Sequence, residues 1–331
     1  DYSTKSDVKY AWDASRCHDL LTLGEAYLLT KDEIYAKKIV GEISSFIEEN
    51  PFMQSINWTC SMDVAIRAVN WLYAIRMIIN SPSFDKAFDS QVKNSLAEHC
   101  FYIEKNLEKG IPCSGNHYIS DLAGLLHLYV LFGEKGKKWD FALQEFLNEL
   151  DFQVLPSGVH YEKSTSYQRL VLELYLYTYL FLINNKVAIP EWAKERIVSM
   201  AHFLDELILE DGTIPLIGDN DNGRFLPFRS CDMTDYRYIV AVSANVFPNN
   251  SFINLSEGST VDELILLGRE RQQNNPIASV RSHFYEDAAF CILNKNDFKV
   301  VTHNTPMSRR IEGEGNLKYS THTHFDLLSF T

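Results

Sequence analysis

The sequence lacks the features that mark several classes of protein. Its six cysteines are spread along the chain without a Cys-x-x-Cys pair, which argues against a zinc ribbon and against a disulfide scaffold. No apolar run reaches the length of a membrane span, and the polar first residues lack the apolar core of a signal peptide. We therefore expect mostly buried, unpaired cysteines and no insertion into a membrane.

Positive charge is also scarce. Lys and Arg number 31 against 44 Asp and Glu, which gives a net charge of -13. A duplex phosphate backbone would be repelled overall, so we expect no nucleic-acid partner. An acidic substrate stays open, because a local pocket of Arg, His and Asn side chains can hold an anion inside an acidic protein.

Apolar residues are plentiful enough for a large core. Of the 331 residues, 46% are hydrophobic and 13% aromatic. From Ala11 to about Leu209 apolar residues recur three or four apart, which predicts a series of paired helices. No fixed-period repeat is visible, so an irregular α/α toroid is favoured over a solenoid of equal units. The expected helices are Ala11–Leu29, Asp32–Glu48, Ser61–Asn80, Phe84–Leu107, Asn116–Phe132, Trp139–Leu150, Ser164–Asn184, Glu191–Leu209 and Tyr236–Asn245.

The character of the sequence changes near Pro276. Phe284–Leu293 and Phe298–Thr302 are short, aromatic and β-branched, with an Asn-Lys-Asn-Asp turn between them, which is typical of a β-hairpin. We therefore predict a mainly α fold with two domains: an incomplete α/α toroid over residues 1–275, and the beginning of an antiparallel β-sandwich over 276–331. We expect the sandwich to continue past Thr331, because the second segment is too short to be self-sufficient.

The first candidate site lies around a pair of tryptophans. Asn57 and Trp58 precede a helix that carries Arg67, Asn70 and Trp71. An indole beside amide and guanidinium groups can hold a sugar, because the ring packs on its apolar face and the polar groups bond its hydroxyls. Trp71 and Arg67 can equally be core and rim residues of an amphipathic helix, and for Trp71 alone this packing role is favoured.

Two further clusters stand just before apolar helices. Asn116 and His117 follow Gly115 at a helix N-terminus, where unpaired N–H groups favour an anion, although an N-cap Asn with an incidental His is equally common. His160, Tyr161 and Glu162 precede the next such helix, in a segment more polar than helix capping requires. Tyr161 can be a core ring where this helix begins.

The last candidates lie toward the C-terminus. Asp219 and Asp221 belong to a segment that resembles a calcium loop in composition but lacks the terminal Glu, so a polar turn is the alternative. His322 and His324 alternate on an expected strand and would face the same side. Two histidines are too few for a zinc site, which needs further ligands.

Taken in order, these motifs resemble the heparinase II/III-like, alginate-lyase-like polysaccharide lyases. The resemblance spans nearly the whole chain. The motifs that carry it are Asn57-Trp58 with Arg67 and Asn70-Trp71, then Asn116-His117, then His160-Tyr161-Glu162 with Tyr167, then Asp219-x-Asp221-x-Gly223-Arg224, then His322-x-His324-x-Asp326-x-x-Ser329-Phe330.

This resemblance implies β-elimination beside a uronic acid in an acidic polysaccharide. Asn116 would bind the uronate carboxylate, with His117 as helper or base. Tyr167 would act as acid, and as base for one substrate epimer. His322 would be the facing base or carboxylate partner from the sandwich. No cofactor is implied for the chemistry, but His324 matches a structural zinc ligand whose partners would lie past Thr331. Further residues expected to bind substrate are Asn57, Trp58, Arg67, His160, Tyr161, Glu162, Asp219 and Arg224.

Other functions remain open at this stage. The family's tyrosine usually follows Ser-Pro and precedes His, whereas here Tyr167 stands between Ser166 and Gln168, so Tyr161 is the alternative. An inverting glycoside hydrolase could use two carboxylates among Glu162, Asp219 and Asp221. A non-catalytic protein that binds acidic glycans or assembles capsule is the third reading. A bacterial periplasmic or secreted location follows from the substrate class alone.

Overall fold

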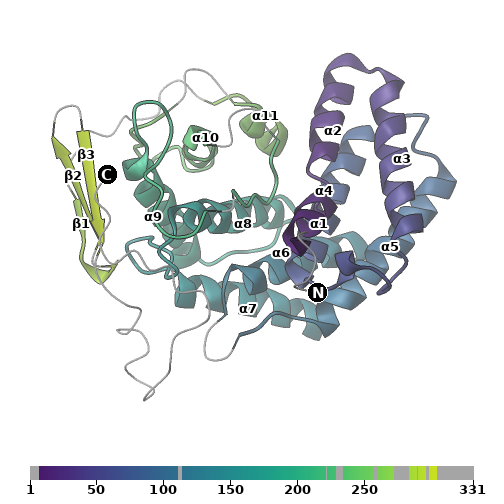
Figure 1. Ribbon diagram of the computed structural model, residues 1–331, viewed down its shortest axis with the longest axis horizontal. Coiled ribbons are helices and arrows are strands. Elements are labelled where there is room, and N and C mark those ends of the chain that lie inside the picture. Colours follow the sequence, from purple (N-terminus) through teal and green to yellow (C-terminus); the bar gives the residue numbers. More distant parts are fainter. Residues whose placement is uncertain are drawn as a thin grey trace. The chain divides into compact units, whose positions relative to one another are not determined.

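A computed structural model describes residues 7–110, 114–220, 222–228, 234–255, 260–271, 283–288, 290–295 and 298–303. Helices predominate in this part of the chain (Figure 1). The mainly α class predicted from the sequence is therefore confirmed. None of the helices within these ranges is both long and apolar enough to cross a membrane.

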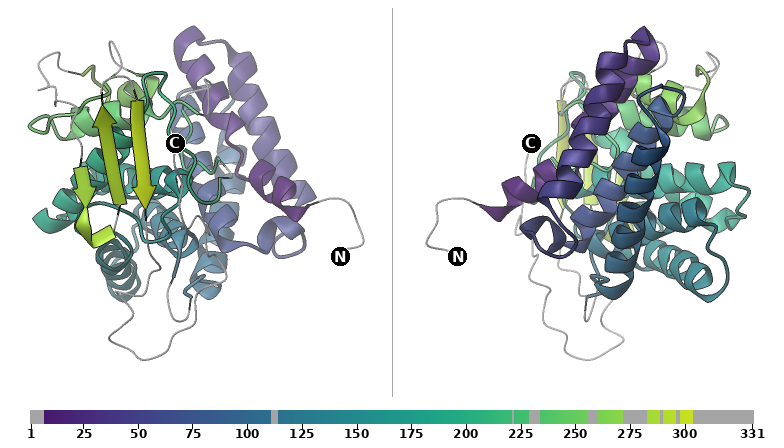
Figure 2. Two further views of the ribbon diagram at one scale, coloured as in Figure 1. Left: turned by 60° about the vertical axis from the view of Figure 1, so that its left-hand side comes forward. Right: turned by 90° about the vertical axis from the view of Figure 1, so that its right-hand side faces the viewer.

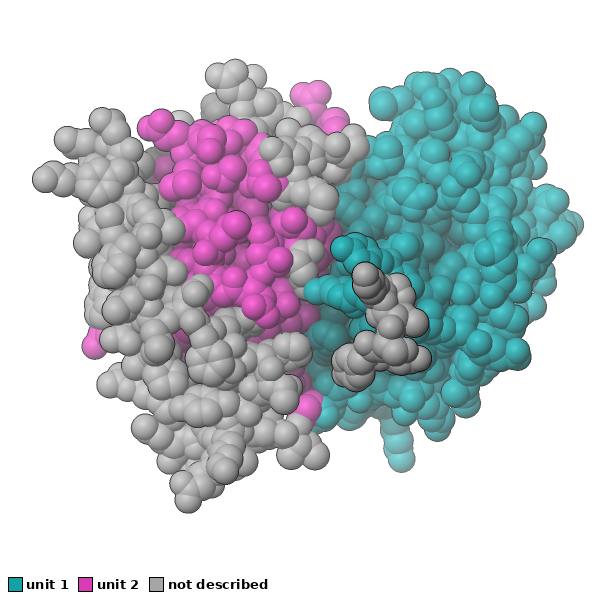
Figure 3. Space-filling view, viewed as in Figure 1, with its two compact units in different colours: residues 1–109, 117–145, 225–230 teal, residues 110–116, 146–224, 231–331 magenta. Residues whose placement is uncertain are grey.

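The chain divides into two compact units (Figure 3). Unit 1 comprises residues 1–109, 117–145 and 225–230, and unit 2 comprises 110–116, 146–224 and 231–331. Two of the points at which the chain passes from one unit to the other fall inside helices. One lies between Asn116 and His117, at the start of the helix Asn116–Phe132. The domain boundary predicted at residue 275 concerns a different division, between helical and β segments, and stays a prediction.

Unit 1 is built around one helix that is buried on nearly every side. This helix is α4, and it packs against α1, α2, α3 and α5. A helix that buries residues around its whole circumference belongs inside a protein, whereas α3 and α5 bury a single stripe and face solvent with the rest. Its elements are α1 (Val8–Ser15), α2 (Asp19–Thr30), α3 (Glu33–Glu49), η1 (Ile56–Trp58), α4 (Ser61–Ile78), α5 (Lys86–Lys105), most of α6 (Asn116–Phe132) and the start of α7 (Lys137–Gln153).

Unit 2 has a comparable centre in α8, which is also buried on nearly every side. It packs against α9 and α10, and α10 packs against α11. The Ser164 side chain caps the start of α8 by accepting a hydrogen bond from the Tyr167 N–H. Besides the end of α7, the helices of this unit are α8 (Thr165–Asn184), α9 (Glu191–Leu207), α10 (Arg237–Val246) and α11 (Val261–Leu267).

The β segment confirms the predicted hairpin and modifies its first strand. Strands β1 (His283–Tyr285), β2 (Phe290–Lys295) and β3 (Phe298–His303) pair antiparallel in that order and lie side by side in Figure 2. The predicted strand Phe284–Leu293 is interrupted by the 3-10 turn η2 (Glu286–Ala288). Distant residues hold this turn, because the Ser157 N–H donates to Asp287 and the Lys163 ammonium donates to the Ala288 carbonyl. A completed sandwich stays a prediction.

Candidate functional site

Asn116 is held at the first residue of α6 by a carboxylate from a distant segment. Glu162 Oε1 accepts from the Asn116 main-chain N–H at 3.1 Å. The Asn116 Nδ2 atom lies 3.2 Å from each Glu162 oxygen. A carboxylate at a helix N-terminus is favoured by the unpaired N–H groups and by the helix dipole. Both side chains are buried, so Glu162 fixes the plane of the carboxamide.

The loop before Asn116 is clamped by the same segment of unit 2. The Tyr161 hydroxyl donates to the Ser114 carbonyl at 2.6 Å, and Gln153 Nε2 donates to the Gly115 carbonyl at 3.3 Å. A Cβ at Gly115 would lie 2.9 Å from Glu162 Oε1. This close approach explains why a glycine precedes Asn116. The structure thus brings together three of the predicted site residues: Asn116, Tyr161 and Glu162.

Tyr167 stands in the first turn of α8 and is half-buried. The start of this helix is fixed against the segment that contains Asp219. The Ser164 hydroxyl donates to the Asp219 carbonyl at 2.6 Å, and the Thr165 N–H donates to the Ile217 carbonyl. The Asp219 residue is exposed. The main-chain position of Tyr167 is therefore well determined by its neighbours.

His160 lies inside the core of unit 2 and has no exposed surface. Its main-chain N–H donates to Gln168 Oε1 at 2.8 Å, and its Nε2 atom lies 3.0 Å from Gln153 Oε1. These contacts support the turn that carries Tyr161 and Glu162. The expected direct contact of His160 with substrate is not supported, because burial removes the ring from any surface.

His117 belongs to unit 1 and meets a carboxylate that the sequence did not single out. Its Nδ1 atom lies 3.2 Å from Glu108 Oε2, and its side chain is 41% exposed. The Met62 N–H donates to the same glutamate oxygen at 2.8 Å and fixes it in place. A carboxylate at Nδ1 favours the tautomer with its proton there, which leaves Nε2 as an acceptor.

A buried thiol completes this group. Cys60 Sγ lies 3.9 Å from both Glu108 oxygens and 4.0 Å from His117 Nδ1. Burial, followed by the charges of Asp63 and Glu108, raises the pKa of the Cys60 thiol. Burial and the Glu108 charge likewise raise the pKa of Asp121, which accepts from the Glu108 N–H at 2.7 Å.

The tryptophan cluster forms part of the core of unit 1. Trp58 is 3% exposed, and Arg67 and Trp71 have no exposed surface. Arg67 Nε donates to His99 Nε2 at 2.9 Å, and Arg67 Nη1 donates to the Asn57 carbonyl at 3.2 Å. Burial lowers the pKa of Arg67 to about 10. The packing role of Trp71 is confirmed, and the contacts give Trp58 and Arg67 the same role rather than the expected sugar-binding one.

Arg224 is likewise held in a buried ion pair. It is 5% exposed, its Nε donates to Glu173, and the Tyr238 hydroxyl donates to the same carboxylate. The guanidinium carbon lies 4.3 Å from the centre of the Tyr238 ring. These contacts describe a structural cation inside unit 2, so direct substrate binding by Arg224 is not supported.

The remaining predicted site residues cannot be placed. Asp221, His322 and His324 lie outside the described residues. The roles of Asp221 as a carboxylate, of His322 as a facing base and of His324 as a zinc ligand stay predictions.

Comparison with known proteins now decides the family. Residues 1–253 match the family described as Heparinase II/III N-terminus. The chain belongs to the heparinase II/III family. The resemblance drawn from the motifs is therefore confirmed. No curated protein matches the chain.

Solved structures of heparinases share the fold. A crystal structure of heparinase III has a TM-score of 0.67 and 17% identity, with 92% of this chain and 47% of that chain covered. The heparan sulfate lyase HepC from Pedobacter heparinus has a TM-score of 0.59 and 21% identity, with coverages of 91% and 45%. This likeness confirms the predicted α/α toroid class. The chain spans less than half the length of these structures.

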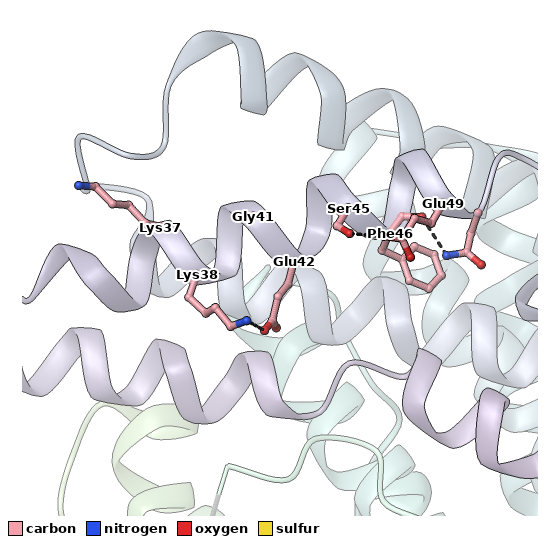
Figure 4. Close-up of a pocket in the computed structure, with 8 residues that line it drawn as sticks. Lys37, Lys38, Gly41, Glu42, Ser45, Phe46 and Glu49 are labelled. Carbon is pink, nitrogen blue, oxygen red and sulfur yellow. Dashed lines mark hydrogen bonds and ion pairs between the residues drawn. The ribbon is translucent and has the colours of Figure 1, made fainter.

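One groove in this heparinase II/III family member adjoins the tryptophan cluster, because Asn57 Nδ2 donates to Asn50 Oδ1 at 2.9 Å and Trp58 Nε1 donates to the Asn50 carbonyl at 3.1 Å. It runs along α3 in unit 1, where Lys38 pairs with Glu42 at 2.8 Å and Ser45 donates to Glu49 (Figure 4). Its lining combines both charges with an aromatic ring and belongs to one helix and the residue after it. The lining residues are Lys37, Lys38, Gly41, Glu42, Ser45, Phe46, Glu49 and Asn50. The groove contains none of Asn116, Tyr161 and Glu162, so the candidate site remains the start of α6.

Proposed function

We propose that this chain forms the helical part of a lyase that cleaves a uronic-acid-containing polysaccharide by β-elimination. The observation that carries the proposal is the buried Glu162–Asn116 contact, which presents a fixed carboxamide at the start of α6. The carboxamide nitrogen is a hydrogen-bond donor, which is the kind of group that binding a substrate carboxylate requires. Family membership supports the same reaction class.

The reaction needs three contributions from the protein. Asn116 binds the uronate carboxylate and withdraws charge from it, so that the proton on sugar carbon 5 becomes removable. His117, oriented by Glu108, or Tyr167 takes this proton as a base. Tyr167 then gives a proton to the leaving glycosidic oxygen. The C–O bond breaks as the carbon–carbon double bond forms, and no water is consumed.

The contacts also favour Tyr167 over Tyr161 as the acid. The Tyr161 hydroxyl donates its proton to the Ser114 carbonyl at 2.6 Å, which commits that proton to holding the loop. A residue whose hydroxyl positions the backbone is poorly suited to deliver a proton in each catalytic cycle. Tyr161 is therefore a positioning residue in this proposal.

The hydrolase alternative is disfavoured by the same geometry. A general acid must hold a proton and present it to the glycosidic oxygen. Glu162 instead accepts hydrogen bonds from Asn116 through both oxygens, so its carboxyl group is used to hold the start of α6. Asp219 is an exposed residue whose main-chain carbonyl is used by Ser164.

The proposal is tested by the mass of the products. The intact protein is incubated with a panel of polysaccharides containing glucuronic, iduronic, mannuronic or guluronic acid. Elimination gives products lighter by one water than those of hydrolysis. We expect unsaturated products, and we expect Asn116→Ala to lower kcat/KM about 10²-fold or more, because a charge-stabilising donor is lost. Products that carry the added water, or wild-type turnover in Asn116→Ala, would refute the proposal.

A further inference from the structure

A thiol, a carboxylate and an imidazole converge in unit 1 from three separate elements. Cys60 immediately precedes α4, Glu108 follows α5, and His117 lies in the first turn of α6. One ligand atom from each lies within 4.8 Å of the other two. The three donors come from separate elements, so the fold and not their order in the sequence brings them together.

The distances match those of a tetrahedral metal site. Zinc bonds of about 2.0–2.3 Å at tetrahedral angles place neighbouring ligand atoms roughly 3.3–3.7 Å apart. The observed distances are 3.2 Å from Glu108 Oε2 to His117 Nδ1, 3.9 Å from Cys60 Sγ to Glu108, and 4.0 Å from Cys60 Sγ to His117 Nδ1. Shifts of a few tenths of an ångström would therefore suffice to close the three ligands around one cation.

Glu108 is held at two points, through its carboxylate and through its main chain. The Met62 N–H donates to its Oε2 at 2.8 Å, and its own N–H donates to Asp121 at 2.7 Å. Supporting hydrogen bonds of this kind orient ligands before the metal arrives. Little reorganisation is therefore needed at this ligand.

We propose that Cys60, Glu108 and His117 bind one zinc ion or a chemically similar cation such as Co²⁺. Thiolate and imidazole donors select such ions over Ca²⁺ and Mg²⁺, which prefer oxygen ligands. Cys60 releases its proton to solvent as the Sγ–metal bond forms. The Nδ1 proton of His117 moves through solvent to Nε2, so that the Nδ1 lone pair supplies the second bond and Tyr167 is the base in the metal-bound protein. The exposed side of His117 leaves room for water as the fourth ligand.

Binding at this site would connect the beginnings of α4 and α6 with the segment after α5. An ion that binds only the folded state stabilises it in proportion to the logarithm of its concentration. The cation would therefore raise the melting temperature of the protein. This expectation does not depend on lyase activity, so it is measured separately from turnover.

The test is a titration of the metal-free protein with Co²⁺. The wild type is expected to bind one Co²⁺ per chain, with the intense near-ultraviolet band of a cobalt–thiolate bond, and Zn²⁺ is expected to displace it. Cys60→Ser removes the thiolate. Because Ser is a favourable residue at the position before a helix, this variant is expected to fold. Cys100→Ser is the matched control, since Cys100 lies on α5 beside Glu104.

The outcomes separate clearly. The proposal predicts that Cys60→Ser loses the cobalt–thiolate band and the rise in melting temperature. Glu108→Gln is expected to bind Co²⁺ at least about tenfold more weakly. Cys100→Ser is expected to behave as the wild type. Absence of a thiolate band in folded wild-type protein, or a band that disappears in Cys100→Ser and persists in Cys60→Ser, would overturn it.

Discussion

At the scale of single residues, the candidate site depends on contacts between segments that are distant in the sequence. Asn116 receives its orientation from Glu162, and His117 receives its orientation from Glu108. In the proposed lyase mechanism, each carboxylate fixes the position of a group that acts on the substrate. The acidic partners therefore act as positioning residues, and their removal should affect turnover more than folding.

Replacement of Glu162 tests this positioning role. Glu162→Gln keeps an acceptor oxygen for the Asn116 N–H, whereas Glu162→Ala leaves the carboxamide unsupported. We expect kcat to fall at least about tenfold further in the Ala variant than in the Gln variant, with a smaller change in KM, because misplacement of a catalytic group mainly affects the transition state.

Steady-state kinetics on the cleaved polysaccharide measure this difference, with the exposed Glu195→Ala on α9 as the control. Equal loss of kcat in the two Glu162 variants would contradict the positioning role.

A buried histidine predicts how stability depends on pH. Burial lowers the pKa of His127 to about 4, from an ordinary value of 6.5. Below pH 6.5, His127 binds a proton in the unfolded chain but stays neutral in the folded protein. Lowering the pH therefore destabilises the fold through this residue. The free energy of unfolding of the wild type, relative to His127→Leu, should fall by about 1.4 kcal/mol per pH unit as the pH drops from 6.5 toward 4.

Urea unfolding of both proteins between pH 7 and 5 measures this term. The subtraction removes the contributions that the two proteins share, such as that of buried His99. Parallel pH profiles would contradict the neutral state of His127.

The sequence predicted several residues of the candidate site, but it did not predict which side chains contact them. Asn116, Tyr161 and Glu162 were singled out because polar residues crowded before apolar helices, and the structure brings them together. Glu108 was missed because a lone glutamate in a polar segment resembles a solvated residue. Burial of Arg67 could not be foreseen, because helical spacing does not distinguish a rim arginine from one that is paired inside the core.

At the scale of elements, most helices follow from apolar spacing, and the exceptions have local causes. The predicted helix Ala11–Leu29 is divided into α1 and α2 at Cys17, whose positive φ of 56° interrupts the helix. Helix α11 was not predicted because it is short. Its signal was present in Thr260 and Glu263, which form a capping box.

Two glycines in helices make a matched pair for testing the packing of α6 on α4. A Cβ at Gly124 would lie 2.7 Å from the Ala65 Cβ and 3.0 Å from its Cα, whereas a Cβ at Gly41 on α3 would meet nothing within 4 Å. We expect Gly124→Ala to destabilise the protein by about 1–3 kcal/mol, because backbone atoms of α4 must move. Gly41→Ala should stabilise it by about 0.5–1 kcal/mol.

Chemical denaturation of the two variants and the wild type measures both effects. A Gly124→Ala protein as stable as the Gly41→Ala protein would show that α4 and α6 do not approach as closely as described.

At the scale of the whole molecule, the family match covers residues 1–253, and the likeness to heparinase structures extends over about nine-tenths of the chain. The α/α class was predictable because long amphipathic segments dominate the sequence. The division into two units was not, because it depends on contacts between residues distant along the chain. The polysaccharide and a periplasmic or secreted location remain proposals based on the reaction class.

The most direct test of the lyase proposal is the ultraviolet absorbance of the reaction mixture. The intact protein and its Tyr167→Phe variant are compared on the uronic-acid polysaccharides, with Tyr161→Phe as the matched tyrosine control. A β-elimination product carries a double bond conjugated to its carboxylate. We predict that absorbance rises with the wild type and stays flat with Tyr167→Phe, while Tyr161→Phe retains more activity. New reducing ends without any rise in absorbance would contradict the proposal and identify a hydrolase.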